Sequence, residues 1–136
     1  GSPAVFGLMR RDVLGQTGLI GEYDASDQVL LVDMALRGTI VEIPDYLFIH
    51  REHDLRSVHA HKNRHSANEW FAARHKGKTT YPEWRLMREY LAVIRNSPLS
   101  LNKKLSCCFN FIRWAKQRGR HKRLWEDLVI NVRGRR

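Results

Sequence analysis

The chain has 136 residues, of which 43% are hydrophobic and 10% aromatic, a composition typical of an ordered globular domain. It contains no apolar run near the roughly 18 residues of a membrane span, and no basic-then-apolar signal segment. The net charge of +10 is unevenly divided: residues 1–60 carry 5 basic and 9 acidic side chains, and residues 61–136 carry 19 and 5. We therefore expect two different surfaces, the second of which attracts phosphates, anionic lipid or nucleic acid.

The first half predicts short strands around one helix. Residues 6–9 are interpreted as a strand, and the glycine-containing segment 15–21 as a loop. A helix is expected over residues 27–37, with capping side chains in residues 24–26 and an end at Gly38. The β-branched residues 39–43 and the apolar residues 46–50 predict two further strands, separated by Pro44. The fold class we expect is α+β, predominantly helical.

The second half begins with a polar, histidine-rich segment, residues 52–68, which is typical of a loop that covers a ligand. Helical patterns follow. The first lies between Pro82 and Pro98, the second begins near residue 101, and a short third one follows Gly119. The apolar residues that define them at steps of three and four are Trp84, Met87, Leu91 and Ile94, then Leu101, Leu105, Cys108, Ile112 and Ala115, then Leu124 and Leu128.

The two cysteines, Cys107 and Cys108, are adjacent. Neighbouring cysteines cannot join distant segments, and they lack the spacing of a zinc or redox motif. We interpret them as buried thiols in a reducing compartment, which fits a cytoplasmic protein. Gly1 and Ser2 look like residues left by cloning, so we expect the natural chain to begin further upstream.

Several segments together resemble the family 2 glycosyltransferases of GT-A fold. They are Gly7-Leu8-Met9-Arg10-Arg11, Tyr23-Asp24-Ala25-Ser26-Asp27-Gln28-Val29-Leu30-Leu31, Leu36-Arg37-Gly38, Ile43-Pro44 and Arg51-Glu52-His53. Their order matches a strand with an arginine, an acidic residue that opens a helix, and a strand pair that ends in an R-x-H element. A weaker resemblance, to the C-terminal extension of some bacterial members, lies in Tyr81-Pro82-Glu83-Trp84-Arg85, Trp114 and Trp125-Glu126-Asp127-Leu128.

The resemblance implies that Asp27 is the catalytic base. An inverting sugar transfer needs a carboxylate that takes the proton of the acceptor hydroxyl, and free amides at a helix N-terminus keep such a carboxylate ionised. From spacing alone, Asp27 is more often a residue that merely caps the helix. Asp24, the nearest competitor, is interpreted as a loop or N-cap residue.

The resemblance also implies a set of residues that bind substrate and diphosphate: Arg10, Arg51, His53 and Ser57. Arginine suits phosphate through its planar donor fork, and His53 is the candidate metal ligand. A divalent cation, Mg or Mn, is expected for the complete enzyme. Without the family, an arginine and a histidine in a polar loop are usually only solvated. We interpret His59, His61 and His65 as part of a pH-sensitive loop rather than a zinc site. Structural zinc sites usually include cysteine or a fourth defined ligand, and this segment provides only histidines as ligands.

The basic stretch 113–123, with Trp114 and Trp125 at its flanks, has two interpretations. Basic residues between tryptophans can bind nucleic acid or lie on an anionic membrane, and the default is a solvated helix face. No zinc finger, RNA-binding signature or helix-turn-helix is present in the sequence, so nucleic acid is not the expected partner. A basic helical binding module remains the alternative function.

The function that follows is a part of an inverting family 2 glycosyltransferase. We expect residues 1–60 to form the acceptor and base side of the catalytic domain, and residues 61–136 a basic helical extension. The chain has no D-x-D motif and no nucleotide-binding βαβ unit. We therefore expect a fragment that transfers no sugar alone and self-associates through the face left by the missing half. The partners are a nucleotide-sugar donor, an acceptor and a membrane surface; the location is cytoplasmic, with peripheral membrane contact.

Overall fold

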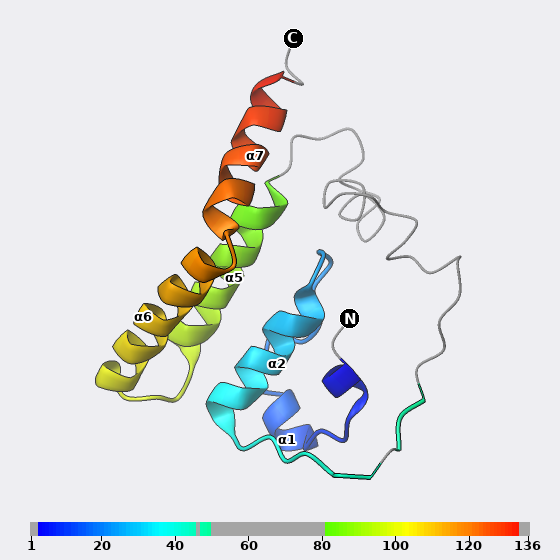
Figure 1. Ribbon diagram of the computed structural model, residues 1–136. Helices are drawn as coiled ribbons and strands as arrows, with labels where there is room; N and C mark the ends of the chain where they lie inside the picture. The colour runs from blue at the N-terminus through cyan, green and yellow to red at the C-terminus, as the bar shows by residue number, and fades with distance from the viewer. Residues whose placement is uncertain (1–2, 46, 50–80, 134–136) are drawn as a thin grey trace.

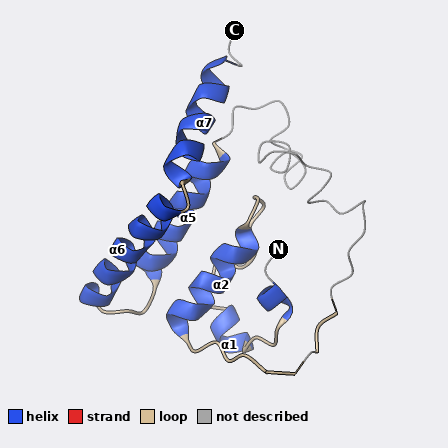
Figure 2. Cartoon of the chain, in the orientation of Figure 1, coloured by secondary structure: helices blue, strands red, loops and turns tan. Residues whose placement is uncertain are grey.

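All regular secondary structure in the described part of the protein is helical. The computed structural model describes residues 3–45, 47–49 and 81–133, with side chains up to residue 130. Its elements are η1 (Pro3–Phe6), α1 (Arg11–Leu14), α2 (Ser26–Arg37), α5 (Pro82–Asn96), α6 (Leu101–Gln117) and α7 (Arg120–Arg133). Helices α5, α6 and α7 form one layer, with α6 and α7 along one side of α5, and α2 lies on another side of α5 (Figures 1 and 2).

Helix α2 confirms the predicted helix to within one residue at its start. It ends at Gly38, whose amide donates to the carbonyl of Met34 at 3.0 Å. The expected side-chain cap is wrong, because the N-cap residue is Ala25, which has a left-handed backbone (φ 64°) and no polar side chain to cap with. Packing against α5, rather than a cap, therefore stabilises this helix.

The three C-terminal helices confirm the predicted helical half. Pro82 opens α5, where its missing amide hydrogen costs nothing. The next amide, that of Glu83, donates to Oδ2 of Asp127 at 2.8 Å, so a carboxylate from α7 caps α5 from 44 residues away. Gly119 separates α6 from α7 and has φ 63°, a conformation that glycine adopts without strain.

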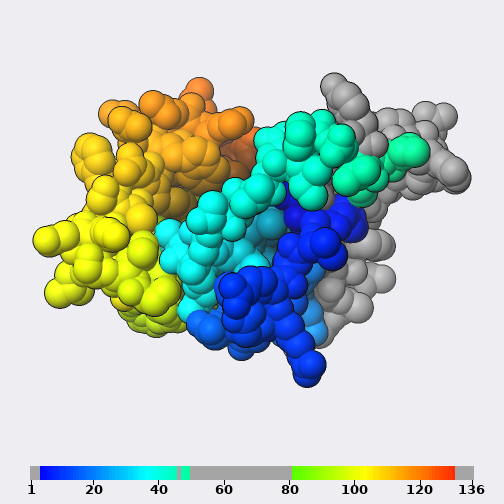
Figure 3. Space-filling model, turned by 90° about the horizontal axis from the view of Figure 1, so that it is seen from below, coloured from blue at the N-terminus to red at the C-terminus, as the bar shows by residue number. Residues whose placement is uncertain are grey.

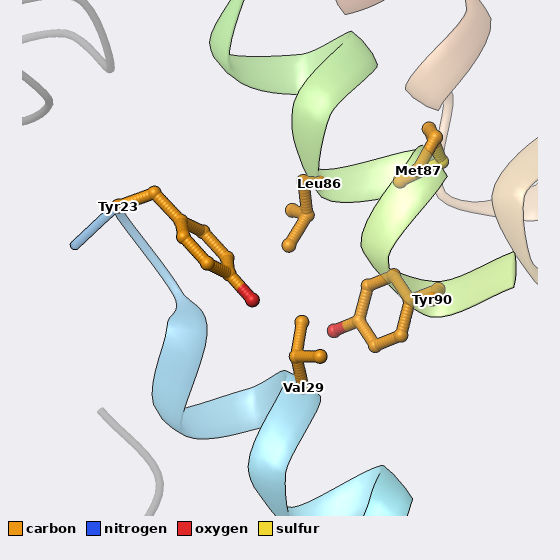
Figure 4. Close-up of a cluster of buried hydrophobic side chains, with 5 residues drawn as sticks. All are labelled: Tyr23, Val29, Leu86, Met87 and Tyr90. Carbon is orange, nitrogen blue, oxygen red and sulfur yellow. The ribbon is translucent and has the colours of Figure 1, made fainter. Parts of the chain in front are cut away.

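The core lies where α2 meets α5. Its buried side chains are Tyr23, Val29, Leu86, Met87 and Tyr90. Figure 4 shows Tyr23 and Val29 on the α2 side of this contact and the other three on α5. Phe111 and Trp114 of α6 pack against Tyr90, with ring centroids 5.4 and 5.8 Å away. Because Leu86 is completely buried, this contact excludes water between α2 and α5.

A buried ion pair joins α5 to α7. Nη1 of Arg120 lies 2.7 Å from Oε1 of Glu83, and the two side chains are 9% and 0% exposed. The guanidinium of Arg120 also lies 4.8 Å from the ring centroid of Trp114. This pair therefore connects all three helices of the C-terminal layer.

The expected α+β fold class is wrong for the described residues. None of them forms a strand: Phe6 ends the short helix η1, and residues 7–9, 39–45 and 47–49 are irregular. Tyr46 and His50, which belong to the last predicted strand, lie outside the described residues. Apolar side chains in this segment are exposed, among them Val41 (79%) and Ile49 (92%). β-branched residues form a strand only when a neighbouring strand pairs with their backbone, and the described residues supply none. The GT-A sheet is therefore absent from them.

The apolar spacing of α6 predicted the helix but not the face that packs. Leu101, Leu105 and Ile112 are 79, 68 and 64% exposed. The side that meets α5 carries Phe111 and Trp114, together with Ala115, the one residue of the predicted spacing that packs against the core. Helix α6 thus has a packed face and a separate exposed apolar face. The expected boundary between the two domains, at residue 60, lies outside the described residues, and α2 and α5 pack together across it.

Candidate functional site

Asp27 lies in the first turn of α2, as the sequence predicted. Its side chain is half-buried, and Oδ1 accepts a hydrogen bond from the amide of Gln28 at 2.9 Å. The same amide also donates to the carbonyl of Ala25 at 3.1 Å, and the positive end of the helix dipole lies beside the carboxylate. Asp27 thus has partial access to solvent at the N-terminal end of α2.

Several other carboxylates of the described residues pair with arginines. Asp12 pairs with Arg10, and Glu83 with Arg120. In α2 itself, Oδ1 of Asp33 lies 2.8 Å from Nε of Arg37, while Oδ2 accepts from the amide of Gly18 at 3.4 Å. Asp33 therefore ties the preceding loop to the middle of α2. Within the described residues, no such cation pairs with Asp27, so its carboxylate is available.

An apolar groove of about 690 Å³ runs between α2, α5 and α6. Figure 3 shows this side of the molecule, with α2 in cyan beside α6 in yellow and orange. The lining residues are Gln28, Leu31, Val32, Leu36, Tyr90, Ile94, Cys107, Asn110, Phe111 and Trp114. Its volume is that of a site for a small organic ligand. Asp27 itself is not among the lining residues, but the residue that follows it, Gln28, is, so Asp27 lies beside the groove at the start of α2.

Arg10, a predicted phosphate ligand, is engaged with Asp12. Its Nε and Nη2 lie 3.2 and 2.9 Å from the two oxygens of that carboxylate. The hydrogen bond from Arg10 lowers the pKa of Asp12 below its ordinary value. Both side chains are well exposed, at 80 and 61%, and a pair so exposed to water is readily displaced by a better anion. No hydrogen bond or ion pair joins Arg10 to Asp27 in the part that the structure describes.

The remaining predicted ligands, Arg51, His53 and Ser57, lie outside the described residues, as do His59, His61 and His65. Among the residues that are described, no group of three His, Cys, Asp or Glu side chains could hold a metal ion. The described residues therefore do not form a site for the divalent cation expected from the resemblance.

Sequence reasoning missed the groove, although α6 carried a usable signal. Cys107, Asn110, Phe111 and Trp114 recur at steps of three, one and three, which places them on one face of a helix. The stronger apolar spacing of the opposite face concealed this one. Cys107 and Cys108 are half-buried free thiols, so the expectation of fully buried thiols is only partly met.

A second feature missed from sequence is the contact that fixes the loop before α2. The guanidinium of Arg85 lies 4.6 Å from the ring centroid of Tyr23, and its Nη1 donates to the carbonyl of Glu22 at 3.5 Å. Burial, and then the negative charge of Glu89, raise the pKa of Tyr23 to about 12. Tyr23 is thus a neutral core residue that holds the approach to Asp27.

Comparison of the chain with protein-family models, curated proteins and solved structures found no match. No helix in the described ranges is long and apolar enough to cross a membrane.

Proposed function

We propose that this chain supplies the catalytic base of an inverting glycosyl transfer from a nucleotide sugar to an acceptor hydroxyl. The observation that carries the proposal is Asp27: a half-buried carboxylate in the first turn of α2, bonded to a helix-terminal amide and paired with no cation among the described residues. The resemblance of residues 7–53 to family 2 glycosyltransferases supplies the reaction class.

The step that Asp27 performs is proton abstraction. As the acceptor oxygen attacks the anomeric carbon from one face of the sugar, its O–H proton moves to a carboxylate oxygen of Asp27. The bond from that carbon to the diphosphate breaks on the opposite face, and its electron pair leaves with the nucleoside diphosphate. The donor would be bound by residues outside the described part.

The groove beside Asp27 offers the acceptor a place to bind. Its walls are mostly apolar, with Gln28 and Asn110 as polar exceptions. Contacts made there, away from the reacting atoms, would hold the acceptor hydroxyl near the carboxylate. The loop in front is fixed by the Asp33–Gly18 hydrogen bond and by the Arg85–Tyr23 contact. The site therefore combines a fixed entrance, a base and a binding wall.

The experiment measures sugar transfer by the natural polypeptide that contains this chain, with Asp27→Asn, Asp24→Asn and Glu126→Gln compared with wild type. Loss of a general base lowers the rate by about 10²- to 10⁴-fold, so we expect that loss for Asp27→Asn with donor binding retained. Glu126, exposed on α7, is the matched control and should leave the rate unchanged. If Asp24→Asn is the inactive variant instead, the base has been assigned to the wrong carboxylate.

A further inference from the structure

Helix α6 exposes a continuous apolar stripe, defined here as Leu101, Leu105, Phe109 and Ile112. These side chains are 79, 68, 68 and 64% exposed. At 3.6 residues per turn they fall within about 80° of one another, along about 16 Å of helix. Scattered exposed apolar residues need no explanation, but an aligned row of four on one helix marks an interaction surface.

The charges of α6 are all of one sign. The helix contains Lys103, Lys104, Arg113 and Lys116, and no acidic residue. Lys116 falls within the angular sector of the stripe, just after Ile112, and Arg113 lies about 40° beyond its edge. Arg113 and Lys116 are exposed, whereas Lys104 donates to the carbonyl of Arg95 at 2.7 Å. The occupant of this face must therefore accept apolar side chains and offer negative charge beside them.

An anionic lipid surface meets both requirements, because it offers an apolar interior and negatively charged headgroups. A nucleic acid would pair with the cations but leave the four apolar side chains in water. A second copy of the chain, docked through the same face, would bring two helices with only positive charges together, which is unfavourable. A helix with an apolar stripe and basic flanks can lie in a bilayer interface, with its apolar side chains among the acyl chains and its cations at the anionic headgroups.

We propose that α6 binds the surface of an anionic membrane through the stripe, with Arg113 and Lys116 at the headgroups. The proposal is independent of the role of Asp27, since the stripe lies on a different face of α6 from the groove. It also explains why the apolar spacing of α6 is regular on the side that the protein core does not use.

The test is cosedimentation of the whole chain with vesicles of phosphatidylcholine, alone or mixed with phosphatidylglycerol. The variant Leu105→Ser/Phe109→Ser removes the middle of the stripe. Its matched control is Leu8→Ser/Val41→Ser, which removes two apolar side chains outside α6 that are at least as exposed. Arg113→Gln and Lys116→Gln each remove one charge. Circular dichroism establishes that each variant keeps the helical content of the wild type.

We expect the wild-type chain to bind the mixed vesicles, and to bind them less tightly as salt is added. The stripe variant should lower the partition coefficient by about 10- to 100-fold, and the Arg113 and Lys116 variants each by about 5-fold on the mixed vesicles, while the control binds as the wild type does. The proposal is overturned if the stripe variant binds like the wild type. It is equally overturned if the chain binds oligonucleotides but not vesicles, or if the stripe only mediates a dimer.

Discussion

The buried pair between Glu83 and Arg120 allows a quantitative test of how the helical layer is held. Nη1 of Arg120 lies 2.7 Å from Oε1 of Glu83, and the two side chains are 9% and 0% exposed. If one partner is removed, the charge that remains is therefore too buried for water to replace the lost contact. Replacing Glu83 by Ala leaves the guanidinium buried and uncompensated, which costs about 3–5 kcal/mol. A domain of ordinary stability unfolds with about 5–15 kcal/mol, so a loss of this size is easily measured.

The double variant Glu83→Met/Arg120→Met separates the cost of an unpaired charge from the worth of the pair. Both charges are then removed together, and apolar side chains of similar volume keep the contact with Trp114. Replacing a buried pair in this way is often neutral, or stabilises by about 1–4 kcal/mol. We therefore expect the double variant to be more stable than Glu83→Ala.

Urea unfolding followed by circular dichroism measures these free energies for wild type, Glu83→Ala, Arg120→Ala and the double variant. Two results would refute the reasoning. A cost below about 1 kcal/mol for both single alanine variants would mean that the pair is exposed to water. A double variant as unstable as the sum of the two single ones would mean that the charges do not interact.

Three further predictions concern the same core. Leu86→Ala should lower the free energy of unfolding by about 2–5 kcal/mol, because Leu86 is completely buried. The control is Leu91→Ala on the same helix, where Leu91 is 44% exposed; it should cost less than half as much. Urea unfolding of both variants measures the two losses. Asp127→Ala should cost about 1–2 kcal/mol through loss of the α5 cap, and an unchanged urea midpoint would argue against the Asp127–Glu83 hydrogen bond. Tyr23 has a folded-state pKa of about 12 against 10.0 for the ordinary phenol, so its stabilising contribution is complete below pH 10 and is lost as pH rises toward 12. Tyr23→Phe should remove that part of the alkaline loss of stability, and identical pH profiles for the two proteins would contradict it.

The sequence predicted the helices well because their signals are local. Pro82, Gly38 and Gly119 mark ends that depend on the backbone of single residues, and α2, α5 and α6 begin or end close to those marks. The strands were predicted from side-chain type alone. A strand needs a partner, which Val41 and its neighbours do not find in the described residues, so β-propensity gave the wrong answer there.

The site was only partly predictable. The first-turn position of Asp27 followed from the helix start, and it is confirmed. The groove could not be predicted, because it needs the relative placement of α2, α5 and α6, which no spacing within one helix contains. In α6 the regular spacing of Leu101, Leu105 and Ile112 predicted the helix, yet these three residues are exposed. Spacing shows that residues share a face, but not whether protein, solvent or another partner covers it.

The most direct test of the role of Asp27 is chemical rescue of Asp27→Ala, in the natural polypeptide that contains this chain, by added formate. Removal of the side chain leaves space at the start of α2 in which a small carboxylate can take the acceptor proton. We predict that formate restores sugar transfer in proportion to its concentration, and leaves the wild type and Glu126→Gln unchanged. Undiminished transfer by Asp27→Ala without formate would contradict the assignment, as would an inactive variant that binds donor normally and that no concentration of formate restores.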